Sequence, residues 1–424
     1  MNSLAPLSKP EVTLSLTLSS TSPASHDHET LKPEERGIRL IQLLLNCANH
    51  ASSGNLHRAD SCLSEISGLA SATGDSMQRL AAWFASALAT RLVKRWPGLY
   101  KSLNHTQQAK VVHLDRARAL FSKTFPYLRF AYTIIARTLL HTMAHEQIIH
   151  IVDLGSGDSK LWVPLLRSFA LLPYGPPQVK VTCISCNTSL LEKLGQRLTK
   201  EAEALDMPFQ FNPLNVPLRE VTVDMLKVRS GEALAFISIL NLHVLLAEDD
   251  RVDAHFGDTK SDASVKNSRQ MSDFLSMIRS LSPKVVFSVE QESDHNLNRL
   301  VDRFVEGLHY YSAVFDSIDA TLGSVAGEER LILEEMFGRE IENIVACEGL
   351  ERFERHERYA RWVVRFTQVG FRPVRLWYSS SSGEDGKEMM DAFGEKGYKI
   401  ISERTSLKIC WHERPLHAVT AWTC

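Results

Sequence analysis

The chain has 424 residues, of which 44% are hydrophobic and 23% are charged, and its formal net charge is −2 at pH 7. This composition is typical of a globular protein that is long enough for one large hydrophobic core or two ordinary ones. The near balance of charge and the lack of a long basic run give little bulk attraction to a polyanion, which argues against autonomous DNA binding.

The N-terminal part of the chain divides into a polar tail and a helical region. Residues 1–34 are rich in Ser, Thr, Pro and His and poor in aromatics, which predicts a disordered tail. From there to about residue 145, apolar residues recur at helical spacing. The first predicted helix ends at Gly54, and the next two cover about 56–69 and 75–94. Two more helices are predicted within about 108–145. We therefore predict a helical cap over about 37–145, added to an α/β core over about 146–424, within one domain of residues 35–424.

Three leucines in the first predicted helix are candidates for contact with a partner. Leu40, Leu43 and Leu44 have the spacing of an LxxLL docking helix, and they lie outside the predicted sheet. Leucines at this spacing also form the buried face of an amphipathic helix, so both interpretations stay open. In either case the surplus of amphipathic helices predicts that the cap carries a surface for partners or self-association.

From Ile149 onward, strand-like runs alternate with helical patterns. The predicted strands cover 149–154, 179–185, 233–240 and 285–289, and the helices between them cover about 158–171, 188–204 and 267–281. Strands separated by helices imply right-handed crossovers and a mainly parallel sheet. The sequence therefore predicts a Rossmann-type α/β fold with an added N-terminal helical cap.

The C-terminal third is predicted to consist of long helices followed by short strands. The helices cover about 295–318 and 326–367, and the strands lie near 397–402, 406–411 and 416–422, where they would form a hairpin at the sheet edge. Three Glu–Arg pairs at i, i+4 predict an exposed, self-supporting helix; they are Glu351–Arg355, Glu354–Arg358 and Glu357–Arg361. A basic edge that binds a partner is the alternative for this segment.

A glycine turn follows the first predicted strand. Asp153 ends the strand, and Gly155 and Gly157 leave room for a ligand such as a nucleoside cofactor. A working site of this kind also needs a carboxylate at the end of the second strand, to bind the ribose hydroxyls. Asn187 stands there instead and offers only a weaker hydrogen bond. A sheet kept as a scaffold, a cleft that binds some other ligand and an active methyltransferase are the three interpretations, and the missing carboxylate favours the scaffold.

The sequence predicts no catalytic residues and no metal site. His141 and His145 have i, i+4 spacing, but the HExxH order of a zinc helix is absent. His243 and Glu290 are candidates by position only, because they follow later strands without an evident catalytic partner. No apolar run approaches the length of about 18 residues that a membrane span needs.

Several segments, in order, resemble the motifs of the plant GRAS family over residues 32–422. LIQLLLNCANHASSGNL resembles its leucine-rich region, IHIVD its VHIID core, EQESDHN its PFYRE region, and WHERPLHAVTAW its closing SAW motif. Trp411 and Trp422 belong to the closing motif, and Trp362 and Gly370 fit the same pattern as structural residues. WPGLYKSLN and ICWHERPL most resemble the scarecrow-like three branch.

This resemblance implies a methyltransferase-like α/β core with a helical cap, in a transcriptional co-regulator that acts in the nucleus without a cofactor. The partners implied are DNA-binding transcription factors of the indeterminate-domain zinc-finger type, DELLA proteins and other GRAS proteins. The branch implies a role in gibberellin signalling and root development. An S-adenosylmethionine-dependent small-molecule methyltransferase is the alternative from another class.

The predicted tail contains a further candidate for partner binding. Leu14, Leu16 and Leu18 alternate, so their side chains point one way when the segment is extended. They resemble the LxLxL repression motif of plant regulators, which a corepressor of the Topless type would bind in a groove. A chance pattern in a Leu- and Ser-rich tail is the other interpretation.

Overall fold

The computed structural model describes residues 32–104, 114–155, 157–248, 268–323, 327–377 and 397–424. Its centre is a nine-stranded sheet with the order β3-β2-β1-β4-β5-β9-β8-β7, in which β6 also pairs with β9. The strands are β1 (Ile148–Asp153), β2 (Gln178–Ile184), β3 (Phe209–Leu214), β4 (Ala233–Ile239), β5 (Val285–Gln291), β6 (Arg372–Val374), β7 (Tyr398–Glu403), β8 (Ser406–Trp411) and β9 (Arg414–Thr423). The pairs among β1 to β5 are parallel and those of β6 to β9 are antiparallel, which confirms the predicted Rossmann-type fold with a hairpin at its edge.

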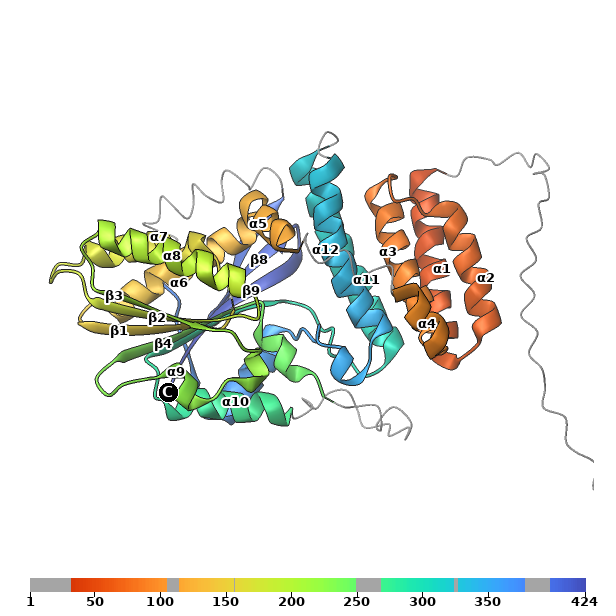
Figure 1. Ribbon diagram of the computed structural model, residues 1–424. Helices are drawn as coiled ribbons and strands as arrows, with labels where there is room; N and C mark the ends of the chain where they lie inside the picture. Colours follow the sequence, from red (N-terminus) through yellow and green to blue (C-terminus); the bar gives the residue numbers. More distant parts are fainter. Residues whose placement is uncertain (1–31, 105–113, 156, 249–267, 324–326, 378–396) are drawn as a thin grey trace, which may run out of the picture.

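Helices cover both faces of the sheet (Figure 1). One face packs on α6 (Pro126–Thr142), α7 (Ser159–Ala170) and α8 (Thr188–Ala204), and the other on α10 (Arg269–Ser280) and α13 (Tyr359–Gln368). Alternate residues of β1 serve the two faces: Ile151 belongs to the first core and Val152 to the second. Both faces of the parallel strands are therefore buried.

A separate helical unit stands beside the sheet. It consists of α1 (Pro33–Ser53), α2 (Leu56–Leu69), α3 (Ser76–Val93) and α4 (Pro97–Asn104), together with α11 (Leu300–Leu322) and α12 (Gly327–Ala346). Figure 1 shows α11 and α12 between the sheet and the N-terminal helices, and α3 packs against both. By contrast, α5 (Leu114–Thr124) and α6 lie on the sheet side. The helical part thus differs from the predicted 37–145, because two helices from much later in the chain complete it.

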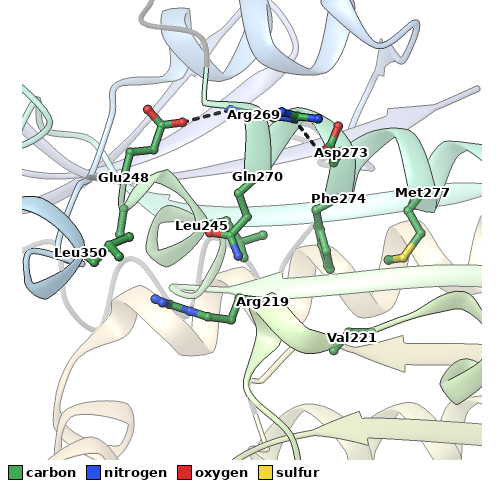
Figure 2. Close-up of a pocket in the computed structure, with 11 residues that line it drawn as sticks. Arg219, Val221, Leu245, Glu248, Arg269, Gln270, Asp273, Phe274, Met277 and Leu350 are labelled. Carbon is green, nitrogen blue, oxygen red and sulfur yellow. Dashed lines mark hydrogen bonds and ion pairs between the residues drawn. The ribbon is translucent and has the colours of Figure 1, made fainter. Parts of the chain in front are cut away.

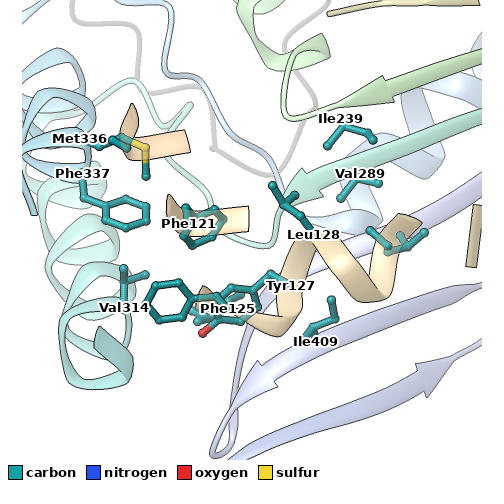
Figure 3. Packing of buried hydrophobic residues seen from close by; sticks show 14 of the residues in the cluster. Phe121, Phe125, Tyr127, Leu128, Ile239, Val289, Val314, Met336, Phe337 and Ile409 are labelled. Atoms are coloured by element: carbon teal, nitrogen blue, oxygen red, sulfur yellow. The ribbon is translucent and has the colours of Figure 1, made fainter. Parts of the chain in front are cut away.

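An aromatic cluster joins the helical unit to the sheet (Figure 3). The Phe121 ring lies edge-on to that of Phe337 on α12, with centroids 5.7 Å apart. Tyr127 at the start of α6 makes a similar contact with Tyr398 of β7 at 5.4 Å. All four side chains are buried, and such ring pairs add to the stability gained from burial.

The long helix predicted over 326–367 is wrong. The chain leaves α12 at Ala346, forms a short 3-10 turn at Gly349–Glu351 and continues as an irregular segment over residues 352–358, the crossing segment, before α13 begins. Asn343 stabilises this exit, since its Oδ1 accepts the backbone N–H groups of Phe353 and Glu354 at 2.9 Å each. Two backbone N–H groups of the crossing segment thus find an acceptor without a helix.

The predicted Glu–Arg pairs are likewise not those of an exposed helix. Glu357–Arg361 is an ion pair at 3.9 Å, but Glu357 itself is fully buried. Glu354 contacts His243 and His356, while the Arg355 guanidinium donates to the Gly349 carbonyl at 3.0 Å. The glutamates and arginines that are spaced for pairing along one helix instead contact different parts of a buried network of charged groups.

The tryptophans of the C-terminal strands are buried. Trp422 stacks on Phe366 of α13, with centroids 4.4 Å apart, and its indole N–H donates to Thr420 Oγ1. Trp411 donates to Asp316 Oδ2 on α11 at 2.7 Å, so it connects the sheet to the helical unit. Gly370 ends α13 with a φ of +92°, a conformation that side chains other than glycine rarely adopt.

Trp422→Ala and Trp411→Ala should each reduce the free energy of unfolding by about 3–5 kcal/mol, because each leaves a large cavity in a packed core. Urea unfolding monitored by circular dichroism measures this. Trp96→Ala is the matched control, since Trp96 is 49% exposed and its loss should have little effect. Equal stability of all three variants and the parent would contradict a structural role for the two buried indoles.

Candidate functional site

The glycine turn after β1 is tied down by Asp153. This carboxylate is fully buried, and it accepts the backbone N–H groups of Gly155 at 3.0 Å and Gly157 at 3.2 Å. It also accepts the indole N–H of Trp162 on α7 at 3.0 Å. Asp153 thus joins the turn to the following helix, and these bonds occupy its oxygens within the protein.

The protein's own side chains fill the space that the two glycines leave. A Cβ atom on Gly155 would lie 2.4 Å from Asn241 Nδ2, and one on Gly157 would lie 2.7 Å from Leu190 Cδ2. Asn241 is held there by a hydrogen bond from its amide to the Leu154 carbonyl. In a nucleotide site the ligand lies close to such a glycine turn. In this protein, side chains of neighbouring segments pack in that space instead.

The polar groups nearest to the turn cap helices. Asn187, at the end of β2, is the N-cap of α8, and its Oδ1 accepts the backbone N–H of Leu190 at 3.0 Å. Asp158 caps α7 and also accepts the hydroxyl groups of Ser122 and Tyr132 at 2.9 Å each. No carboxylate takes the ribose position after β2, where Ser185, Cys186 and Asn187 stand. This geometry favours the scaffold interpretation over a cofactor cleft.

A cluster of buried and partly buried ionisable groups, the polar cluster, lies where β4 and β5 end. It consists of His243, Glu290, His295 and His356, which are buried, and Glu340 and Glu354, which are partly buried. His243 Nδ1 lies 2.9 Å from Glu290 Oε2, and its Nε2 lies 3.1 Å from Glu354 Oε2. His356 Nε2 approaches the same Glu354 oxygen at 3.2 Å, and the two imidazole rings are 4.2 Å apart between centroids. Residues from β5, from the turn after β4 and from the crossing segment therefore meet at one point.

The histidines of the polar cluster differ in charge. Burial disfavours the imidazolium form of His243, but the Glu290 and Glu354 carboxylates outweigh it and raise the pKa of His243 to about 10. Burial lowers the pKa of His295 and His356, and a neighbouring histidine lowers each further, which favours their neutral forms. Burial, with the Glu354 charge, also raises the pKa of Glu340 to about 7.

Further ion pairs hold the crossing segment in place beside the polar cluster. Arg365 on α13 donates two hydrogen bonds to the fully buried Glu357 carboxylate, at 2.6 and 2.7 Å. Glu306 on α11 accepts from Arg358 at 2.8 Å and from Arg414 at 2.7 Å. These two arginines outweigh the effect of burial and lower the pKa of Glu306 to about 2. The segment is thereby tied to α11, α13 and the last strand.

The polar cluster was missed as a unit by sequence reasoning. The sequence indicates His243 and Glu290 by position alone, and its local spacing predicts that Glu354 lies on an exposed helix. Glu354 lies 111 residues after His243 and 64 residues after Glu290 in the chain, and no spacing rule relates a strand end to an irregular segment. The mixed charges of residues 351–361 were the only available signal, and they fit an exposed helix equally well.

A pocket of about 520 Å³ opens between the turn after β4 and α10 (Figure 2). Its lining includes the apolar side chains of Leu245, Phe274 and Met277 and the charged side chains of Arg219 and Glu248. The Glu248 carboxylate accepts the backbone N–H of Arg269 at 3.0 Å. This pocket lies on the α10 side of the sheet and shares none of its lining residues with the glycine turn.

The three candidate leucines of α1 are buried. Leu40, Leu43 and Leu44 are 0%, 3% and 0% exposed, so they cannot contact a partner while the helical unit is folded. The apolar residues that α1 exposes are Ile38 and Ile41, at 58% and 38%. The LxxLL spacing marks the inner face of an amphipathic helix, and the docking interpretation of these leucines is wrong. The other candidates, Leu14, Leu16 and Leu18, lie outside the described residues.

Comparison with known proteins finds relatives along nearly the whole chain. The family model described as the GRAS domain family matches residues 40–423. Scarecrow-like protein 3 of Arabidopsis thaliana is 39% identical, over 96% of this chain and 93% of that protein. Scarecrow-like transcription factor PAT1 of the same plant is 33% identical, over 89% of this chain and 75% of that protein. Among solved structures, SCL7 of Oryza sativa superposes with a TM-score of 0.75 at 28% identity, covering 90% of this chain and 99% of that one.

Arg365→Met should reduce the free energy of unfolding by about 3–5 kcal/mol, because it leaves the Glu357 carboxylate buried without its main partner. The double variant Glu357→Gln/Arg365→Met removes both charges and should recover much of that loss. Urea unfolding of the three proteins measures the difference. A double variant as unstable as the single one would contradict the importance of the pair.

S-adenosylmethionine should bind no more tightly than a high-micromolar dissociation constant, and no methyl transfer should occur. One missing charged hydrogen bond to the ribose weakens binding by about 1.5–3 kcal/mol, or about ten- to a hundredfold. Isothermal titration tests this directly. Asn241→Ala is the matched variant, because it clears the space over Gly155 without supplying a carboxylate, and it should stay weak. A low-micromolar constant that is lost in Gly155→Val would revive the enzyme interpretation.

Proposed function

The chain belongs to the GRAS domain family, and from this we propose that it is a transcriptional co-regulator that acts in the plant nucleus through contacts with other proteins. The family match covers residues 40–423, and one relative carries the name of a transcription factor. The chain is not an enzyme. Its Rossmann-type sheet serves as a scaffold that positions helices and loops.

The occupied glycine turn is the observation that carries this proposal. Asn241 and Leu190 stand where a ligand would approach Gly155 and Gly157. Asp153 and Asn187 are committed to the turn and to a helix cap. An S-adenosylmethionine-dependent methyltransferase, the alternative function, would need this space and a ribose carboxylate, so it is not favoured.

DNA contact is proposed to come from the partner. The net charge of −2 supplies no general attraction to a polyanion. We infer that the chain binds DNA-binding factors of the indeterminate-domain zinc-finger type, and that DELLA and other GRAS proteins compete for or share this association. A role in gibberellin signalling and root development belongs to the same proposal, which rests on the likeness to scarecrow-like proteins.

The outer side of the helical unit is the proposed docking surface for these partners. Ile38 and Ile41 are exposed near the start of α1. Trp96, which precedes α4, and Leu99 of α4 are also exposed, but they follow Arg95, which lies at the other end of α1 beside Ala51. Large apolar side chains on the exposed face of a helix suit a partner helix or loop. Leu14, Leu16 and Leu18, in the segment before α1, are proposed to bind a Topless-type corepressor.

Co-purification from plant nuclei, followed by identification of the bound factors, tests the proposal. The double variant Ile38→Asp/Ile41→Asp should lose binding of the zinc-finger factor by at least about tenfold, because it places two charges in an apolar interface. Its melting temperature should stay close to that of the parent, since both side chains are exposed.

Leu171→Asp/Tyr174→Asp is the matched control, because these residues are 83% and 70% exposed but lie beyond the end of α7 on the sheet side. The control should bind normally. The same preparations show whether Leu→Ala changes at positions 14, 16 and 18 release a corepressor. Undiminished partner binding by the Ile38/Ile41 variant would contradict a docking surface at these two residues. Absence of the chain from nuclei would contradict the proposed nuclear function.

A further inference from the structure

We propose that His243, Glu354 and His356 form a binding site for one divalent metal ion, and that zinc is the ion their donor set suits. One ligand atom from each residue lies within 4.8 Å of the others. Two histidine nitrogens and one carboxylate oxygen are a frequent set of protein ligands for zinc. The 3.1 and 3.2 Å separations from Glu354 Oε2 to the two Nε2 atoms are close to the roughly 3.3 Å that tetrahedral ligands at about 2.0–2.1 Å from zinc require.

The direction of the hydrogen bonds around His356 decides which of its nitrogens carries a proton. The Ser293 hydroxyl donates to the Glu306 carboxylate at 3.0 Å, so at 2.9 Å it can only accept from His295 Nε2. In the tautomer that donates through Nε2, His295 Nδ1 is an acceptor, and it lies 3.0 Å from His356 Nδ1. His356 must therefore donate through Nδ1, which leaves a lone pair on Nε2.

That lone pair faces another acceptor. His356 Nε2 is buried and has no hydrogen-bond partner among the described residues, although Glu354 Oε2 is 3.2 Å away. Two acceptors at this distance repel each other unless a cation lies between them. A proton on His243 can bridge from its Nε2 to Glu354, but it does not reach the lone pair of His356. A metal ion satisfies all three atoms together.

The surroundings of these ligands are those that support a metal. His243 Nδ1 faces Glu290, and Glu290 is itself fixed by the backbone N–H of Leu242 at 2.9 Å. Such a carboxylate behind a ligating histidine orients the ring and strengthens it as a donor. His295 has the corresponding position behind His356.

The site also has a way in for an ion. The His243 and His356 side chains are 5% and 1% exposed, whereas that of Glu354 is 16% exposed. Solvent therefore reaches the carboxylate side, where an ion can enter and where a water molecule can complete four-fold coordination. The ligands come from the turn after β4 and from the crossing segment, so a bound ion would join them.

Metal binding is measured on the full-length chain after chelator treatment. Zinc titrated against a chromogenic chelator should bind at about one equivalent per chain. Cobalt(II) in its place should give visible absorption bands of low coordination number, without the near-ultraviolet charge-transfer band of a thiolate ligand. This spectrum also separates the site from the seven free cysteines. The cobalt experiment needs no variant, so it decides the question even if a substituted chain fails to fold.

His356→Gln should abolish the stoichiometric binding, and Glu290→Gln should weaken it about 10- to 100-fold, as for other residues behind a metal ligand. His150→Gln is the matched control, because His150 is equally buried and lies 2.9 Å from a carboxylate, that of Glu232, outside the polar cluster. The control should bind zinc like the parent. Lack of zinc binding by the parent chain, a thiolate band with cobalt, or full binding by a folded His356→Gln variant would each overturn the proposal.

Discussion

The burial of charge in the crossing segment is the constraint on which the arrangement of the whole protein depends. Arg352, Arg355 and Glu357 are almost completely withdrawn from solvent, and each needs partners to offset the loss of hydration. The partners come from every side: Arg352 donates to the His295 carbonyl, Arg355 to Asn296, and Glu357 accepts from Arg365. The crossing segment can be buried only if two elements are positioned to contact it: helix α13 and the loop that follows β5.

The same requirement extends into the helical unit. Arg303 of α11 is fully buried and donates to the Ile344 carbonyl and to Glu348, which follows α12. Arg79 of α3 pairs with Glu334 of α12 at 2.8 Å, both buried. These pairs connect helices that are far apart in sequence, whereas apolar packing alone would tolerate several arrangements of the same helices. Buried ion pairs of this kind are better suited to specifying one arrangement than to adding stability.

The glycine turn after β1, which in other Rossmann-type sheets lies against a ligand, here lies against side chains of the protein itself. A positive φ and the lack of a Cβ atom at Gly155 allow a close neighbour, and in this chain the neighbour is Asn241 from the loop after β4. Asp153 points its oxygens to its own turn and to Trp162. The polar groups that remain concentrated at the strand ends lie further along the sheet, in the polar cluster after β4 and β5.

The sequence by itself determined the elements whose burial follows a simple period. The parallel strands β1, β2, β4 and β5 and the helices α7, α8 and α10 were predictable, because a strand buried on both faces is continuously apolar and an amphipathic helix repeats every 3.6 residues. The strand β3, with half-buried residues and Pro213, and the three-residue β6 lack such a pattern and were missed. Only the tertiary structure decided that Leu40 and Leu44 face inward and that residues 352–358 are irregular. The reason is physical: Glu and Arg at i, i+4 are compatible with an exposed helix, and whether each charge finds a buried partner depends on chain segments that local spacing does not describe.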